Sequence, residues 1–247
     1  MLPRVLEPET LDHLAPDDPA AQRARRDLRR VNAFMGARGI LERALEKALA
    51  ATDETVGGVG RRLRILEIGC GDGRLMLEVA RHRGARWPGV ELDLLDRQPI
   101  VDPETIAAYA AAGWQARPRI ADVLDWADDR GSAEHWDVVV ANLFLHHFDD
   151  AQLRRMLALA ARRTHTFIAC EPRRSSLALA GSHLLGLVGC NDVTRHDAVV
   201  SVRAGFADGE ITASWPSESG WSLDERARGL FSHAFVARRG GSLCRSF

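Results

Sequence analysis

The stretch from Leu66 to Gly73 reads Leu-Glu-Ile-Gly-Cys-Gly-Asp-Gly and is the strongest structural signal in this chain. An apolar run typical of a buried strand stands directly before three glycines at alternate positions. Helix-forming residues follow from Arg74 to His82, so the glycines lie in a turn between a strand and a helix. Glycine permits a tight turn and lets a ligand touch the backbone. The stretch therefore predicts an α/β fold with a ligand site at this turn.

Strand-like and helix-like segments continue to alternate after this turn. We expect strands at 63–68, 90–95, 116–120, 136–141 and 166–170, with helices at 74–82, 103–112 and 151–162. Such alternation is typical of a parallel sheet covered by helices on both faces. Two later strand candidates, 222–226 and 231–237, predict a terminal antiparallel pair. The predicted fold is α/β, a doubly wound, mostly parallel, seven-stranded Rossmann-like sheet with an N-terminal helical lid.

The regions outside the alternating pattern suggest how the chain is organised. Residues 21–50 show helical spacing of apolar side chains, and we expect two helices that break near Gly36 and Gly39. We assign residues 1–56 to an N-terminal tail and helical lid, and residues 57–247 to the main domain. Residues 173–206 are an expected insertion in that domain. The insertion contains an apolar helix at 175–188, a polar stretch at 191–197 and a short helix that ends at Gly205.

The composition is that of an ordinary folded chain, with 247 residues, 46% of them hydrophobic, and a formal net charge of −1. This balance provides no basic attraction for nucleic acid, so we expect no such partner. The four cysteines (Cys70, Cys170, Cys190 and Cys244) are far apart, which predicts neither a metal site nor a disulfide framework. The acidic N-terminus lacks a secretion signal, and the longest apolar stretch falls short of the roughly 20 residues of a membrane span. We expect a cytoplasmic protein with no transmembrane segment, and we leave the oligomeric state open.

The glycine turn resembles motif I of the class I S-adenosylmethionine-dependent methyltransferases, in which an acidic residue is followed by x-Gly-x-Gly-x-Gly. Glu67, Gly69, Gly71 and Gly73 match this motif. The resemblance implies that the turn, including Cys70, lies beside the methionine part of the cofactor, and that Glu67 helps to place the ammonium group. The glycines are more closely spaced than in the dinucleotide-binding pattern, so a pyrophosphate cradle is less well supported.

Carboxylates near the end of the second expected strand are candidates for binding the ribose. Asp96 follows the glycine turn at about the separation expected for such a carboxylate in this architecture. Glu91 and Asp93 compete for the role, but both lie within the strand, whereas Asp96 stands at its carboxyl end. We favour Asp96, because its two oxygens can accept from adjacent hydroxyls there. The alternative role for Asp96 is a helix cap or a turn.

Two later segments extend the resemblance, which covers roughly residues 60–172 with four ordered motifs. Asp122 and Val123 resemble the segment that recognises adenine, where Asp122 would accept from the exocyclic amine and the Val123 N–H would donate to the ring. The segment after the fourth strand resembles that of small-molecule methyltransferases related to the quinone-biosynthesis enzymes. This second likeness implies that Asn142 and Leu143 lie against the methionine and the sulfonium.

Three histidines are candidates for chemistry on the methyl acceptor. In the resemblance His146 or His147 would face the acceptor, and packing or capping is their alternative role. His196 stands beside Asp197 in the polar stretch and is the best acceptor-side acid/base candidate from the residues alone. A solvated turn in which Asp197 caps a helix is the alternative. Histidine suits removal of a phenol proton because the ordinary pKa of its ring lies near neutrality.

The resemblance implies methyl transfer from S-adenosylmethionine to a small-molecule acceptor. We expect an oxygen or carbon of an aromatic, quinol-like or polyketide-derived compound, covered by the insertion at 173–206. The apolar helix, Phe34 and Met35 are expected to form one wall of the acceptor pocket. The sequence does not separate O-, C- and N-methylation. A nucleotide-dependent oxidoreductase and a non-catalytic cofactor-binding scaffold are the alternatives, since a fold alone does not establish chemistry.

Overall fold

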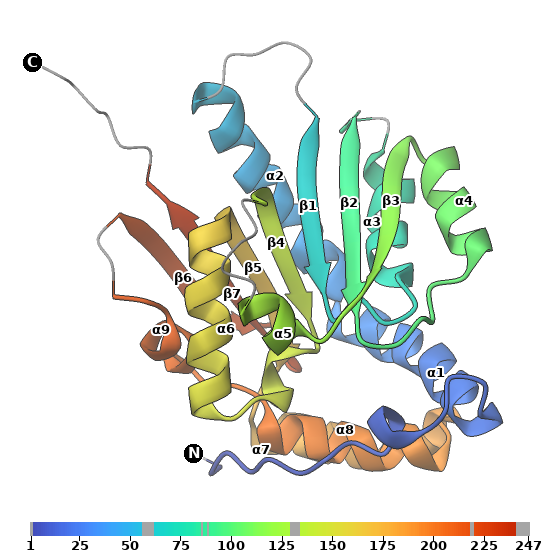
Figure 1. Cartoon of the computed structure of the whole chain (residues 1–247). Coiled ribbons are helices and arrows are strands. Elements are labelled where there is room, and N and C mark those ends of the chain that lie inside the picture. The colour runs from blue at the N-terminus through green and yellow to red at the C-terminus, as the bar shows by residue number, and fades with distance from the viewer. Residues whose placement is uncertain are drawn as a thin grey trace, which may run out of the picture.

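A seven-stranded sheet forms the centre of the computed structural model, which describes residues 2–55, 62–84, 86–87, 89–128, 134–217 and 220–240 (Figure 1). The strand order is β3-β2-β1-β4-β5-β7-β6. The strands are β1 (Leu63–Ile68), β2 (Val90–Asp96), β3 (Trp114–Ile120), β4 (Trp136–Asn142), β5 (Thr164–Pro172), β6 (Trp221–Arg228) and β7 (Ser232–Arg239). The first five pair in parallel, while β7 is antiparallel to both β5 and β6. The predicted mostly parallel sheet with an antiparallel terminal pair is confirmed.

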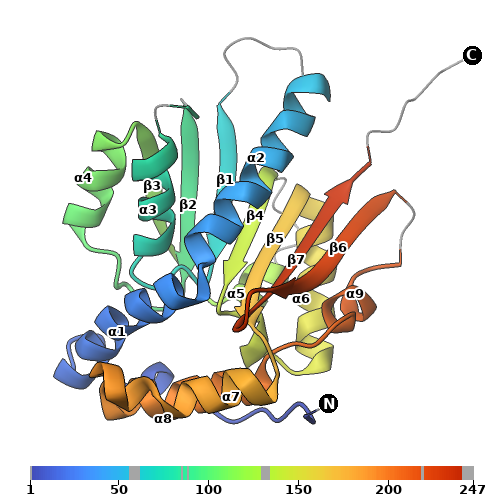
Figure 2. The same cartoon turned by 180° about the vertical axis from the view of Figure 1, so that it is seen from behind.

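Helices cover both faces of this sheet. One face carries α5 (Val123–Asp128), α6 (Asp150–Arg163) and α9 (Glu210–Ser214), which lie towards the viewer in Figure 1. The other face carries α2 (Ala37–Thr55), α3 (Arg74–Arg83) and α4 (Pro103–Ala111), seen from the front in Figure 2. A separate apolar core fills each interface, because buried strands present hydrophobic side chains to both sides. Because helices cover both faces, the part of the sheet left open is the edge where the strands end.

A third group of helices lies beyond the carboxyl ends of the parallel strands (Figure 1). It consists of α1 (Pro19–Met35), α7 (Ser176–His183), η3 (Leu185–Val188) and α8 (Asp192–Ala204), of which η3 is a 3₁₀ helix. The N-terminal segment, with the 3₁₀ helix η1 (Leu11–His13), packs against α8. Ligands of open α/β sheets bind outside the carboxyl ends of the strands, so this group covers the edge where a ligand is expected.

The chain after β5 differs from the expected pattern. The expected apolar helix at 175–188 is divided at Leu184 into α7 and η3. The polar stretch at 191–197, for which a solvated turn was the alternative, contains the first half of α8. The side chain of Asn191 accepts from the Thr194 N–H and begins this helix, a start signal that outweighs the polar composition of its first turns.

The N-terminal helices agree with the sequence, with one refinement. They break at Gly36, whose φ of 68° is left-handed, while Gly39 lies inside α2. The expected domain boundary at residues 56 and 57 falls outside the described residues, as does Cys244. The other three cysteines are free thiols. Within the described part of the chain, no helix is both long and apolar enough to cross a membrane.

Candidate functional site

A cavity of about 660 Å³ lies at the carboxyl ends of β1, β2 and β4. Nine of the ten cofactor-binding residues expected from the sequence line it: Glu67, Gly69, Cys70, Gly71, Asp96, Asp122, Val123, Asn142 and Leu143. The tenth, Gly73, does not line the cavity and instead caps the start of α3. Residues that are far apart in the sequence, from Glu67 to Leu143, therefore line one cavity.

The three glycines of the turn share a left-handed backbone but differ in what surrounds them. Their φ angles are 65° at Gly69, 56° at Gly71 and 70° at Gly73. A β-carbon on Gly69 would lie 2.1 Å from the ring of Phe144, whereas one on Gly71 would meet no atom within 4 Å. The carbonyl of Gly73 accepts from the buried Tyr109 hydroxyl at 2.5 Å. Gly69 thus serves packing, Gly73 anchors the turn on α4, and Gly71 leaves open space beside the cavity.

Three carboxylates, those of Glu67, Asp72 and Asp96, line the cavity around the turn. Glu67 is buried, and its Oε2 has no hydrogen-bond partner. Burial, followed by repulsion from Asp72 and Asp96, raises the pKa of Glu67 well above its ordinary value. A buried polar atom without a partner costs free energy. The cavity therefore fits a ligand that brings positive charge and hydrogen-bond donors, as an ammonium group does.

Asp96 ends β2 and contacts the glycine turn directly. Its Oδ2 accepts from the Gly71 N–H at 2.9 Å, and its Oδ1 accepts from the Gln98 N–H at 2.9 Å. Each oxygen keeps a further lone pair for ligand hydroxyls. The competing carboxylates, Glu91 and Asp93, pair with arginines of β3 and do not line the cavity. Of the three carboxylates, only Asp96 lines the cavity.

The loops after β3 and β4 complete the cavity wall. Asp122 accepts from a backbone N–H two residues on and begins α5, with Val123 beside it in the wall. Asn142 donates to Asn32 of α1 at 3.1 Å, and its own Oδ1 is buried without a partner. Leu143 has a positive φ of 49°. All other described residues with a positive φ are glycines. Such a conformation costs roughly 1 to 2 kcal/mol and is retained where it positions groups at a site.

A group of titratable side chains, which we call the histidine cluster, borders the cavity and consists of Glu9, His146, His147 and Glu171. His146 belongs to the 3₁₀ helix η2 (Leu145–His147) and is buried. Its Nδ1 lies 2.8 Å from Glu171 Oε2, and its Nε2 lies 3.1 Å from Glu9 Oε1. Burial opposes charging of this ring, but hydrogen bonds to the two carboxylates raise the pKa of His146 to about 9. His146 is therefore an imidazolium that joins the N-terminal segment to β5.

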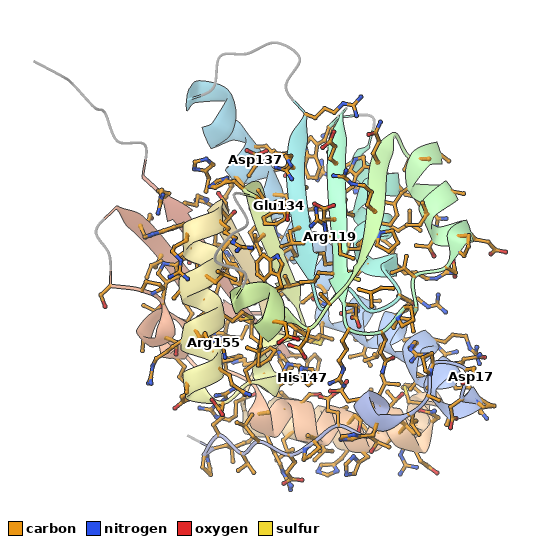
Figure 3. The ribbon with its side chains drawn as sticks, in the orientation of Figure 1. Asp17, Arg119, Glu134, Asp137, His147 and Arg155 are labelled. Atoms are coloured by element: carbon orange, nitrogen blue, oxygen red, sulfur yellow. The ribbon has the colours of Figure 1, made fainter. Side chains whose placement is uncertain are left out.

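His147 is arranged differently and lies between the end of the sheet and α8 (Figure 3). Its Nδ1 lies 3.0 Å from the carbonyl oxygen of Phe144, which can only accept, so Nδ1 carries a proton. Its Nε2 makes no hydrogen bond, although Glu9 Oε2 lies 3.4 Å away and Asp12 Oδ2 lies 3.8 Å away. Nε2 is thus the ring nitrogen of His147 that is open to a ligand in the cavity.

The same three groups, Glu9, His146 and His147, are the set of described residues whose ligand atoms could hold a metal ion, all within 4.8 Å of one another. The sequence led us to expect no metal. The hydrogen bond between His146 and Glu9 accounts for the closeness of these two side chains without an ion.

Sequence reasoning missed the two carboxylates of the histidine cluster. Glu171 accepts from the N–H groups of Phe144 and Leu145 as well as from His146, so it orders the whole of η2. Its position at the end of β5 is a signal that would have found it, because polar residues there face the ligand edge. Glu9 stands in the N-terminal tail, where no local pattern marks it.

His196 lies apart from the histidine cluster. Its side chain is 58% exposed on α8, and it lines neither this cavity nor the one described next. Its neighbour Asp197 accepts from the backbone N–H groups of Thr10 and Leu11 at 2.8 and 2.9 Å. Asp197 therefore caps the start of η1 and holds the N-terminal segment, while the geometry gives His196 no contact with a ligand in either cavity.

A second cavity of about 280 Å³ adjoins the first. Glu9, Leu11, Leu28, Leu143 and Ser201 line both cavities, so the two spaces meet at the histidine cluster. The other walls come mainly from the helices beyond the strand ends. Their apolar members are Ala24, Val31, Phe34, Met35, Ala178, Leu184, Leu185, Val188, Ala198, Val202 and Phe231. Phe34, Met35 and part of the 175–188 segment thus form a wall, as the sequence suggested.

The sheet of this order, with a cavity at its carboxyl edge, has the Rossmann-like architecture that solved methyltransferases share. Comparison with known families is more specific. Residues 66–180 match the family model described as a methyltransferase domain. This match agrees with the methyltransferase activity and the S-adenosylmethionine cofactor that the sequence predicts.

Curated relatives match a shorter segment. Over 89 residues the chain is 37% identical to trans-aconitate 2-methyltransferases of Mycobacterium tuberculosis (strain ATCC 25177 / H37Ra) and Mycobacterium bovis (strain BCG / Tokyo 172 / ATCC 35737 / TMC 1019). The match covers 36% of this chain and 29% of each relative. This chain therefore matches less than a third of the length of these relatives.

Solved structures share the fold. The plantazolicin methyltransferase BpumL, solved with a triazolic desmethylPZN analog and SAH, aligns with a TM-score of 0.60 at 12% identity, over 90% of this chain and 92% of that one. An O-methyltransferase family protein from Burkholderia thailandensis aligns with a TM-score of 0.53 at 21% identity, over 89% and 62% of the two chains. Similarity at these identities establishes the architecture and not the substrate.

Proposed function

We propose that this chain transfers the methyl group of S-adenosylmethionine to a small aromatic acceptor that carries a hydroxyl group. The observation that carries this proposal is the junction of the two cavities at Leu143, beside the histidine cluster. The cofactor supplies an activated methyl group on a sulfonium. A displacement of this kind needs the donor and the acceptor close and in line, and two cavities that share a wall provide that placement.

The larger cavity contains groups suited to each part of the cofactor. Glu67 has a buried oxygen without a partner and would accept from the ammonium group. Asp96 would accept from the ribose hydroxyls through its remaining lone pairs. Asp122 and Val123 would bind the adenine edge, and Asn142 would meet the methionine part. All five of these residues line the larger cavity.

His147 is the proposed base for the acceptor hydroxyl. Its Nε2 has no hydrogen bond, and the ring lines the first cavity beside Glu9, a residue that lines both cavities. His146 is not suited to this role, because both of its ring nitrogens are engaged and the ring is already charged at neutral pH. It is a positioning residue that holds Glu9 beside His147. A positioned base typically contributes about 10²- to 10⁴-fold to the rate.

The chemistry of the second cavity supports an aromatic, quinol-like or polyketide-derived acceptor. Trans-aconitate, which the curated relatives are named for, is a polyanion, and polyanions are usually held by arginine or lysine. None of the described residues that line the second cavity is arginine or lysine. An acceptor with an apolar body is therefore better matched to this chain than a polyacid.

The first test separates cofactor binding from turnover. Calorimetric titration with S-adenosylmethionine and S-adenosylhomocysteine should show binding, whereas NAD and NADP should not bind. Turnover is then followed as S-adenosylhomocysteine formed with simple phenols and catechols. Binding of NAD or NADP would support the oxidoreductase alternative, and cofactor binding without turnover of any acceptor would support the scaffold alternative.

The role of His147 is tested against the histidine that the sequence favoured. His147→Gln should lower kcat on the order of 10²-fold and leave the affinity for S-adenosylhomocysteine unchanged. His196→Gln is the matched control, since its exposed ring lines neither cavity. A larger loss of turnover in His196→Gln than in His147→Gln would return the catalytic role to His196.

A further inference from the structure

We propose that the acceptor is an amphiphile, with a hydroxyl-bearing ring at the histidine cluster and a hydrocarbon chain that fills the second cavity and leaves between α1 and η3. This inference rests on the proposed function, because it names the substrate class of the same site. It commits the second cavity to one occupant, the chain of the acceptor.

The polar side chains in the second cavity are already satisfied by the protein. The Ser182 hydroxyl donates to the Leu179 carbonyl at 2.8 Å, and the Thr194 hydroxyl donates to Asn191 Oδ1 at 2.8 Å. Asp197 is engaged by two backbone N–H groups of the N-terminal segment. Away from the histidine cluster, the described lining therefore offers a ligand mainly apolar surface. A hydrocarbon chain loses nothing there, whereas a polar group would lose its hydrogen bonds to water.

The far end of the second cavity reaches the surface through large apolar side chains. Phe34, Leu184 and Val188 line the cavity and are nevertheless 64%, 58% and 47% exposed. Leu187 of η3, next to this rim, is 84% exposed. A contiguous exposed apolar group of this kind marks a binding surface more often than chance placement. We call Phe34, Leu184 and Val188 the apolar rim, and a chain that emerges here would cover it.

The polarity of the lining changes from the first cavity to the second. Glu9 lines both cavities and His146 and His147 line the first, whereas the second cavity is lined mainly by apolar side chains that include the rim. An amphiphile matches this gradient in only one orientation, with its hydroxyl at His147 and its chain pointing outwards. The gradient therefore selects both the class of the acceptor and its direction of entry.

A series of 4-alkylphenols with chains of one, five and nine carbons tests the proposal. Binding to the protein saturated with S-adenosylhomocysteine is measured by calorimetry, and kcat/KM is measured with S-adenosylmethionine. Burial of each methylene is worth about fourfold in affinity, so affinity and kcat/KM should rise steeply with chain length until the chain passes the rim. Affinity that does not depend on chain length would overturn the proposal.

Two variants test whether the hydrocarbon chain of the acceptor lies in the second cavity. Ala198→Phe narrows the lining, and Leu184→Asp puts a charge on the rim; each should reduce the nine-carbon to one-carbon ratio of kcat/KM at least tenfold. Leu223→Asp, on β6 and 36% exposed, is the matched control and should leave the ratio unchanged. Thermal unfolding confirms that each variant folds. A ratio that survives both Ala198→Phe and Leu184→Asp would exclude this path for the chain.

The outcomes separate this inference from the function on which it rests. Chain-length-dependent binding without methylation of any phenol would overturn the proposed reaction but retain the occupant of the cavity. Methylation of all phenols with equal kcat/KM would retain the reaction and overturn the amphiphile. A second copy of this chain seated on the rim would appear as a dimer that Leu184→Asp dissociates, with no response to chain length, and would also overturn it.

Discussion

At the scale of single residues, Gly69 and Gly71 show that the same motif letter has two different physical reasons. Both have a left-handed backbone, in which any side chain adds strain. Only Gly69 also lacks room, because Phe144 packs against it. Gly71 has room in the absence of a ligand, so the demand for glycine there comes from the cofactor that would approach the backbone.

Substitution by alanine should therefore affect different properties at the two positions. Gly69→Ala is expected to lower the free energy of unfolding by about 2 to 4 kcal/mol, from backbone strain and displacement of the Phe144 ring. Gly71→Ala should cost about 1 to 2 kcal/mol of stability and weaken S-adenosylmethionine binding at least tenfold. Urea unfolding and calorimetric titration measure the two effects. Equal stability of both variants would contradict the packing role of Gly69.

Glu67 provides a second prediction at this scale, through proton release. Burial and the neighbouring carboxylates raise the pKa of Glu67 well above its ordinary value, so Glu67 holds its proton more strongly than an ordinary glutamate does. A cationic ligand favours the carboxylate, so binding S-adenosylmethionine should release protons into solution. Calorimetry in buffers of different ionisation enthalpy measures this release, which Glu67→Gln should abolish. Unchanged proton release in the variant would remove Glu67 from the ammonium site.

At the scale of elements, the N-terminal segment is held in place by contacts with distant parts of the chain rather than by a hydrophobic core of its own. Asp197 of α8 binds the backbone of Thr10 and Leu11, and Arg4 donates to the carbonyls of Phe148 and Ala204. These contacts place Glu9 against the histidines. The segment therefore completes the site, although its own sequence carries no motif.

Release of this segment should impair turnover more than cofactor binding. Asp197→Ala is expected to lower the free energy of unfolding by about 1 to 3 kcal/mol, since two N–H groups lose their acceptor. It should also lower kcat/KM for the acceptor, because Glu9 is no longer held beside His147. Asp192→Ala, in the first turn of the same helix with a side chain 97% exposed, is the control and should stay within about 0.5 kcal/mol. Equal behaviour of the two variants would deny the segment its role.

At the scale of the whole molecule, the histidine cluster joins three parts of the fold: the N-terminal segment, η2 and β5. Its centre is His146, charged between Glu9 and Glu171. Burial acts against the charge of Glu9, but the hydrogen bond from His146 and the nearby ring of His147 hold the pKa of Glu9 well below its ordinary value. Opposite shifts of the two partners mean that the charged pair itself contributes to folding.

The stability of the protein should consequently depend on pH with a defined sign. The pKa of His146 is raised from 6.5 to about 9, so its contribution is complete below pH 6.5 and is lost as the pH rises through about 9. The contribution of Glu9 is present above its ordinary pKa and is lost as the pH falls. We expect the free energy of unfolding to decrease between pH 7 and pH 9 by on the order of 1 to 3 kcal/mol.

Urea unfolding at pH 6, 7.5 and 9 measures this dependence. His146→Gln cannot titrate and should be less stable at pH 6 but flatter across the range. An equally steep decrease in His146→Gln would assign the pH dependence to other groups.

The sequence by itself determined the class of fold, the order of its elements and which residues line the larger cavity. Periodicity and turn chemistry are local, so the strands, the glycine turn and the choice of Asp96 over Asp93 follow from residues close together in the chain. The local patterns after β5 were weaker, and there the polar stretch at 191–197 belongs to α8, because a single capping side chain decided the helix start.

Only the tertiary structure decided which groups surround the acceptor. Glu9 lies 137 residues from His146 in the chain, and no periodicity or motif spacing connects them. Asp197 is a second case: it keeps the contact with its neighbour His196, at 3.0 Å, but the fold also brings the distant backbone of Thr10 and Leu11 to it. Short-range backbone preferences fix where a strand ends, whereas packing of separate helices over that end fixes which distant side chains meet there.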